Sequence, residues 1–193
     1  MLVGDQMTLK PAYDPAPLKQ RMQEQAKHLK RLLIDLPDHD AITDVFDYVV
    51  GAQYGLTKAL EFGFVDRVGA WHSTYRSHLP QYADNIAAQK QVNDLWLAGF
   101  YFNSGIQRLA ACFDRVPKLL GASGKDAGKR MKNVNAGSYV AWEKVYTEIN
   151  AFKHATEGKA AGRTVSMEDA VQAFEETLNL LTKNEAKLAK AYG

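Results

Sequence analysis

The chain has 193 residues, of which 46% are hydrophobic and 24% charged, and its formal net charge is +2. This length suits one domain with a sizeable core, and the composition excludes a disordered chain, which needs low hydrophobicity together with high net charge. The single cysteine, Cys112, excludes an internal disulfide and a metal site built from several cysteines, and we expect it to be a small buried hydrophobe.

The start of the chain and its apolar runs bear on where the protein resides. Residues 1–12 lack the basic region, the apolar stretch and the cleavage site of an export signal. The longest apolar run, residues 95–102, is much shorter than the ~20 residues that cross a bilayer. We therefore expect a cytoplasmic protein with no membrane segment, composed of an N-terminal extension (1–13) and a single helical domain (14–193).

Two amphipathic helices are predicted in the first third of the chain. Asp14 and Pro15 form a start signal, and apolar residues then recur at three-to-four spacing until Pro37 ends the helix. A second helix is predicted from residues 38–40 onward. It carries Gly51 and Gly55, and we expect these glycines to allow a neighbouring helix to approach closely.

Further helices are predicted at residues 68–79, from 83 or 91 to 120, at 138–157, and from 166 towards the C-terminus. Ser166, followed by acidic residues, is the expected N-cap of the last one. Between two of these helices, residues 121–137 are predicted to be a glycine-punctuated basic linker. The sequence has no convincing strand pattern, so the predicted fold is all-α, an up-and-down helical bundle of five or six helices.

Charge is distributed unevenly along the chain. Residues 33–71 contain seven acidic and two basic residues, whereas residues 118–163 contain nine basic and four acidic ones. Such asymmetry can orient two copies of a protein or attract a polyanion. The segment Lys125 to Lys132 could contact phosphates, but it has no interleaved aromatic residue to stack on bases. A solvated loop is the other interpretation.

One helix places polar side chains beside an apolar stripe. If Trp142 and Tyr146 face inward, Asn150 and His154 lie one turn apart at the border between that stripe and solvent. An imidazole there can titrate near neutrality, and a carboxamide one turn away could orient it. A half-buried histidine without a function is the plainer interpretation. Lys153 points towards the stripe, and it must reach past the helix end, meet an acidic partner, or face a cleft in a dimer.

The two aromatic-rich helices, the basic loop and the capped helix that follows resemble the HEPN superfamily of helical bundles over about residues 91–193. The resemblance implies a homodimer, because many HEPN proteins are metal-independent endoribonucleases whose two copies form a composite cleft for RNA. Their signature is an arginine, a polar residue, three variable residues and a histidine. On this chain the polar position falls on Asn150 and the histidine on His154.

The arginine of that signature has no counterpart here. Its position falls on Ile149, and wider spacings give Glu148 or Thr147, none of which is basic. A guanidinium would hold the phosphate and offset developing charge, and isoleucine has no group for that work. The resemblance therefore implies the fold and the dimer more than the nuclease activity.

Two functions follow from the resemblance. The first is a HEPN-like non-catalytic binding or regulatory protein, linked to toxin–antitoxin or defence systems, whose partner is RNA or another protein. The alternative is a metal-independent endoribonuclease. In it His154 and Asn150 are the catalytic residues, and Lys153, Lys159 or Arg163 supplies positive charge.

A third function, small-molecule binding, rests on aromatic residues alone. A pocket between helices would be lined by Trp96, Tyr101, Trp142 and Tyr146, although such rings are more often plain core. No Glu-x-x-His pair, His-Glu-x-x-His motif or cysteine cluster occurs. We therefore expect neither a metal nor a cofactor.

Overall fold

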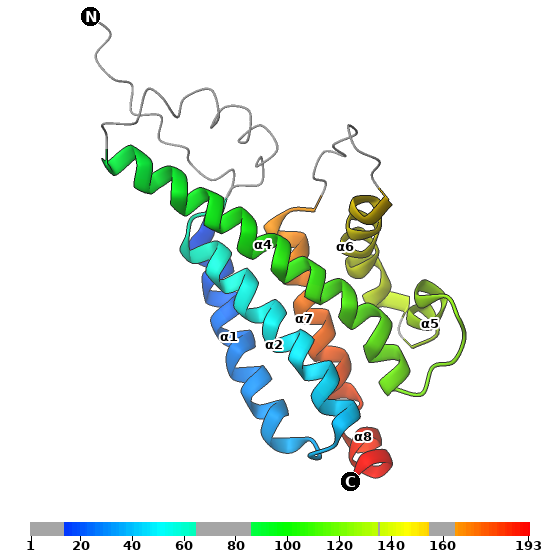
Figure 1. The fold of residues 1–193 in the computed structure, drawn as a ribbon. Coiled ribbons are helices and arrows are strands. Elements are labelled where there is room, and N and C mark those ends of the chain that lie inside the picture. Colours follow the sequence, from blue (N-terminus) through cyan, green and yellow to red (C-terminus); the bar gives the residue numbers. More distant parts are fainter. Residues whose placement is uncertain (1–13, 65–85, 135, 155–164) are drawn as a thin grey trace, which may run out of the picture.

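The computed structural model describes residues 14–64, 86–134, 136–154 and 165–193. The predicted extension at 1–13 and the helix predicted at 68–79 lie outside these ranges. The described part contains seven helices: α1 (Pro15–Asp35), α2 (Asp40–Glu61), α4 (Ile86–Leu119), α5 (Ala127–Val134), α6 (Ala136–His154), α7 (Met167–Lys183) and α8 (Glu185–Tyr192). The predicted all-α bundle is confirmed, and Figure 1 shows its long helices packed side by side.

The ends of α1 follow the predicted signals. The Asp14 side chain accepts the N–H of Ala16, and Pro15 occupies the first helical position. The helix ends at Asp35, two residues before Pro37. The N-cap of α2 is a histidine rather than an acidic residue. The ring nitrogen of His39 accepts the N–H of Ala41 at 3.1 Å.

The closest helix packing lies between α2 and α4, and it confirms the role expected for one of the two glycines. A Cβ atom on Gly55 would lie 2.8 Å from the backbone of Gly105 and 2.8 Å from the Tyr101 carbonyl oxygen. A side chain at this position would therefore force the helices apart. Beyond it, the rings of Phe64 and Phe102 stack with centroids 4.1 Å apart. The helices run antiparallel, since Asp44, early in α2, pairs with Arg115, late in α4, whereas Gly55, later in α2, meets Gly105, earlier in α4.

The first described helix, α1, lies parallel to α7 and to the start of α8. Three contacts join α1 to α7 and α8, and the partners in all three are 154 residues apart: Arg21 with Glu175, His28 with Thr182, and Arg31 with Glu185. A constant offset in residue number means that the two chain segments run in the same direction. The N-terminal and C-terminal parts of the described chain are therefore fastened to each other along their length.

The prediction of a linker over residues 121–137 is wrong, because this segment contains α5. The Asp126 side chain accepts the N–H of Lys129 at 2.9 Å and so caps the start of the helix. Met131 is buried and joins the main core. Positive φ angles at Gly121 and Gly124 let the chain turn back from α4 into this short helix.

The last predicted helix begins as expected but is divided. Ser166 and Asp169 form a capping box at the start of α7, with each side chain accepting the backbone N–H of the other. The helix ends at Lys183, and α8 starts at Glu185 after a break at Asn184.

One continuous hydrophobic core joins the helices, from Leu18 on α1 to Leu188 on α8. Cys112 lies fully inside it, which confirms the prediction of a small buried hydrophobe, and burial raises the pKa of its thiol to about 12. Among the described helices, none is both long and apolar enough to cross a membrane.

Candidate functional site

The predicted polar pair lies near the C-terminal end of α6. The helix continues through His154, so Asn150 and His154 occupy positions one turn apart, as expected. The structure describes the backbone of these residues and of Lys153 but not their side chains. Lys159 and Arg163, the two further predicted cations, lie outside the described residues.

The inner and outer faces of α6 are defined by residues before this pair. Trp142 and Val145 are buried, whereas Glu143 and Thr147 are exposed. Glu143, Thr147, Asn150 and His154 follow one another at three-to-four spacing. Helical register therefore places the positions of Asn150 and His154 in line with an exposed row.

The position that corresponds to the nuclease arginine is part of the core. Ile149 is only 5% exposed and packs in the main cluster. Glu148 is buried as well, and its Oε2 atom accepts the backbone N–H of Val165, just before α7. Both residues thus fasten α6 to the interior and to the start of the next helix.

Two of the aromatic residues predicted to line a pocket make core contacts. Trp142 is 1% exposed, its ring stacks on Phe113 with centroids 4.3 Å apart, and its Nε1–H donates to the Ala173 carbonyl oxygen at 3.0 Å. Tyr146 is half-buried, with its ring 6.4 Å from that of Phe113. The single polar group of Trp142 is therefore already used inside the bundle.

The other two predicted aromatics lie nearer the N-terminal end of α4 than Phe113 does. Trp96 stacks on Phe100 at 5.9 Å, and Tyr101 meets the rings of Tyr54 and Phe62 on the α2 side. Trp96 and Phe113 are separated by about 25 Å of helix, at 1.5 Å per residue. The structure therefore does not bring the four predicted residues into one pocket, although a pocket formed by fewer of them stays a prediction.

The aromatic rings at this end of α4 leave considerable apolar surface uncovered. Trp96 and Phe100 are 54% and 55% exposed, and Tyr54 is exposed beside them. We call the following four residues the aromatic patch: Tyr54, Trp96, Phe100 and Tyr101. Charges of both signs flank it, in the ion pairs Lys58–Glu61 and Lys90–Asp94.

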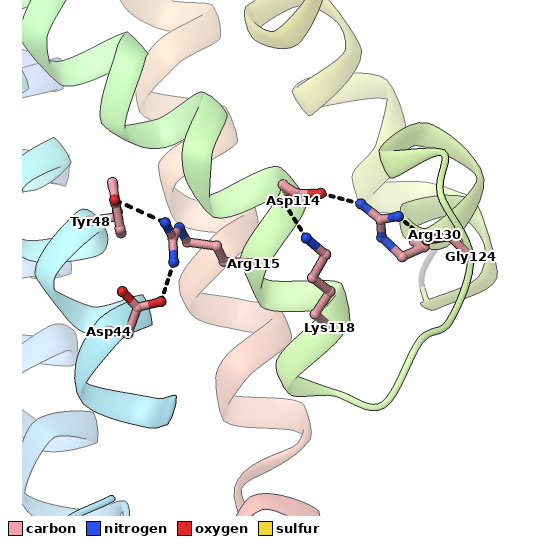
Figure 2. Close-up of polar contacts among 7 residues, drawn as sticks. All are labelled: Asp44, Tyr48, Asp114, Arg115, Lys118, Gly124 and Arg130. Atoms are coloured by element: carbon pink, nitrogen blue, oxygen red, sulfur yellow. Dashed lines mark hydrogen bonds and ion pairs between the residues drawn. The ribbon is translucent and has the colours of Figure 1, made fainter. Parts of the chain in front are cut away.

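A polar cluster lies near the C-terminal end of α4, where the adjacent residues Asp114 and Arg115 reach towards different helices (Figure 2). Arg115 forms an ion pair with Asp44, donates to the Tyr48 hydroxyl at 3.1 Å, and lies 4.4 Å from the centre of the Tyr48 ring. These contacts fix α4 against α2 beyond the glycine contact.

The neighbouring residue, Asp114, ties α4 to α5. It pairs with Lys118 at 2.5 Å and with Arg130, whose guanidinium also donates to the Gly124 carbonyl oxygen (Figure 2). Arg130 is only 3% exposed, so its charge is held inside the protein by these two partners. Burial alone would raise the pKa of Asp114, but the hydrogen bonds and charges of Lys118 and Arg130 outweigh it and lower that pKa.

Three exposed lysines lie on or just before α5: Lys129 and Lys132 on the helix, opposite in helical register to its buried side, and Lys125 in the turn that precedes it. We define Lys125, Lys129 and Lys132 as the lysine face. The ammonium of Lys132 lies 4.3 Å from the centre of the Tyr139 ring, and the Tyr139 hydroxyl donates to Glu143 at 2.9 Å. This hydrogen bond raises the pKa of Tyr139. An aromatic residue from α6 therefore accompanies the basic segment, although the segment contains none itself.

Sequence reasoning missed the buried ion pair between Arg130 and Asp114. Sixteen residues separate the partners, and no helical spacing links them. One signal was present: in helical register Arg130 falls on the same side of α5 as Met131 and Val134, opposite Lys129 and Lys132. This pattern indicates a buried Arg130 only if residues 127–134 are already known to form a helix.

Within the described ranges, no three histidine, cysteine or carboxylate residues lie close enough together to hold a metal ion. No family model, curated protein or solved structure gives a significant match to this chain. Function is therefore inferred from the residues and their contacts.

Proposed function

We propose that this chain is a HEPN-like binding or regulatory protein that acts as a homodimer and does not cleave RNA. The observation that carries the proposal is the burial of Ile149, which occupies the arginine position of the nuclease signature and packs in the core. Loss of a preorganised donor from such a site typically lowers the rate by about 10²–10³. A signature with one more intervening residue would place the arginine at Glu148, which is a buried carboxylate and would repel a phosphate.

The aromatic patch supports the homodimer. Monomeric proteins rarely leave large contiguous apolar surfaces open, and aromatic rings are enriched in protein interfaces. A second copy suits this surface because both charge signs flank it, in Lys58–Glu61 and Lys90–Asp94. Around a two-fold axis the same patch faces itself, so acidic and basic residues can meet across the contact.

The absence of catalysis is testable with purified protein and mixed RNA in the presence of a chelator. We expect no cleavage above the protein-free control, and no difference between the wild type and the variants His154→Ala and Asn150→Ala. Cleavage that occurs with the wild type and disappears with His154→Ala contradicts the proposal. Cleavage that persists in both variants comes either from a contaminating nuclease or from other residues of this chain, and activity that co-elutes with the protein through a further purification step contradicts the proposal.

One observation favours the alternative, a metal-independent endoribonuclease. Because α6 extends through His154, the positions of Asn150 and His154 remain one turn apart on a continuous helix, as a cooperating pair requires. In this alternative Lys153, Lys159 or Arg163 supplies the positive charge that Ile149 lacks. The rate would then follow the titration of an imidazole, with a pH profile that His154→Ala abolishes.

A further inference from the structure

Positive charge is concentrated around α5. Residues 118–134 contain five basic residues and one acidic residue, Asp126. Lys118 and Arg130 share the carboxylate of Asp114. The other three basic residues form the lysine face, and none of them pairs with a carboxylate among the described residues. Their charge is therefore available to an anion from outside the chain.

The lysine face is held on a fixed support. A helix of eight residues is too short to be stable alone in water, so α5 depends on its contacts with the bundle. Met131 anchors it in the core, while Arg130 ties it to α4 and to the turn at Gly124. Lys132 is further oriented by the Tyr139 ring, and its ammonium retains donors for another partner. Lys129 and Lys132 thus project from a positioned helix, and Lys125 from the turn just before it.

The chemistry of this surface favours phosphates over a protein partner. Protein interfaces are anchored by buried aromatic or apolar side chains and are depleted in lysine. The outward side of α5 offers no such anchor, since Lys129, Lys132 and Asn133 are all exposed and polar. Lysine ammonium groups act as point charges that bind phosphate without the forked geometry with which arginine reads a base.

The size of the surface favours a single strand. An eight-residue helix is about 12 Å long, too short to reach the successive grooves that duplex-binding domains span. Phosphate contacts fix a strand in position but carry no sequence information. We propose that the lysine face contacts the phosphate backbone of single-stranded nucleic acid without reading its sequence. This inference names the partner of the proposed binding function and rests on it.

Three phosphate contacts predict a definite salt dependence. For single strands, the slope of log K against log salt is about −0.7 per contact, which gives about −2 for three lysines. Raising salt from about 50 to about 200 mM should then weaken binding roughly twentyfold. Each lysine removed should flatten the slope by about 0.7.

The test measures fluorescence anisotropy of a short, labelled, mixed-sequence single-stranded RNA, with the matching DNA strand as a second probe. The variant Lys125→Gln/Lys129→Gln/Lys132→Gln removes the lysine face. The matched control is Lys19→Gln/Lys27→Gln/Lys30→Gln, which removes three exposed lysines from α1, on the other side of the bundle (Figure 1). We expect the first variant to lose at least about tenfold in affinity and nearly all of the slope, and the control to retain both. Circular dichroism confirms that each variant is folded.

Several outcomes would overturn the inference. They are no binding by the wild type at low salt, equal losses in the two variants, or competition by polyglutamate or anionic vesicles that exceeds competition by unlabelled RNA. Equal losses would show that only net charge matters. These results leave the proposed function standing, because RNA integrity after incubation is read separately on a gel. Conversely, cleavage that depends on His154 defeats the proposed function even if the lysine face binds.

Discussion

At Arg130, the contribution of side-chain packing to stability can be measured separately from that of its hydrogen bonds. Its stem is buried, its Nε atom has no hydrogen-bond partner in the described structure, and its two partners, Asp114 and Gly124, both reach solvent. We expect Arg130→Ala to lower the free energy of unfolding by about 2–3 kcal/mol, because stem packing and two hydrogen bonds are lost. Arg130→Met restores the volume, and water can replace the guanidinium at both partners, so its loss should stay within about 1 kcal/mol.

Urea unfolding followed by circular dichroism measures both Arg130 variants. If the methionine variant is as unstable as the alanine variant, the hydrogen bonds rather than the buried stem hold α5 in place.

Replacing each of the two α2 glycines with alanine should change stability in opposite directions. In Gly55→Ala the new methyl group would meet the backbone of Gly105 at 2.8 Å, which cannot move without separating the helices. We expect a net loss of about 1–3 kcal/mol, although alanine itself favours a helix. In Gly51→Ala the methyl group meets only the side chain of Arg108, which is exposed and can turn away. Here the helix preference should dominate and raise stability by up to about 1 kcal/mol. Thermal unfolding of both variants checks the contrast, and equal effects contradict it.

At the scale of an element, the start of α7 links stability to pH. Burial alone would raise the pKa of Asp169, but hydrogen bonds from Lys144 and Ser166 outweigh it, and the pKa is lowered. A lowered pKa in the folded state contributes stability above the ordinary carboxyl pKa, about 4, and this contribution disappears as pH falls through the folded value. Asp169→Asn should therefore destabilise the protein near neutrality, and its difference from the wild type should shrink in acid below about pH 4.

The measurement is the free energy of unfolding of both proteins from neutral pH to strongly acidic pH. Asp47→Asn, which removes an exposed carboxylate on α2, is the control for loss of an ordinary surface charge. A gap between the wild type and Asp169→Asn that stays constant throughout the acid range contradicts the expected role of the carboxylate.

Elements with both a cap and a periodic apolar face could be predicted from the sequence. Asp14 with Pro15 and Ser166 with its acidic first turn marked the starts of α1 and α7 correctly. α5 was missed because glycines surround it and its inner face includes a charged residue, Arg130. A hydrophobic pattern cannot reveal a helix whose buried side depends on an ion pair from another element.

In the candidate site, too, features set by local sequence could be predicted, and contacts between helices could not. The one-turn spacing of Asn150 and His154 on a single helix follows from local sequence, and α6 does extend that far. The contact of Lys132 with Tyr139 and the pairing of Arg130 with Asp114 depend on how helices pack. Helical spacing alone does not encode such contacts.

At the scale of the whole molecule, the bundle is closed by pairing its first described helix, α1, with its last two, α7 and α8. Arg21 bonds to Glu175 through both Nε and Nη2 and also reaches Glu168, so one side chain spans two turns of α7. These hydrogen bonds raise the pKa of Arg21 further above its ordinary value, so its charge is present at all accessible pH values. This pairing does not cover the aromatic patch on α2 and α4, where Tyr54, Trp96 and Phe100 stay exposed.

The homodimer can be tested through that patch. We expect light scattering after size exclusion to give the wild type a mass of twice the chain's 21.5 kDa. The variant Trp96→Ser/Phe100→Ser should elute as a monomer, because it removes the two most exposed rings of the patch, at 54% and 55%. The control is Leu33→Ser/Ile34→Ser, which removes an exposed apolar pair of 49% and 73% from α1 and should leave the dimer intact. A monomeric wild type at every accessible concentration contradicts the homodimer itself. A dimer that survives loss of Trp96 and Phe100 shows instead that the two copies meet through another face of the bundle.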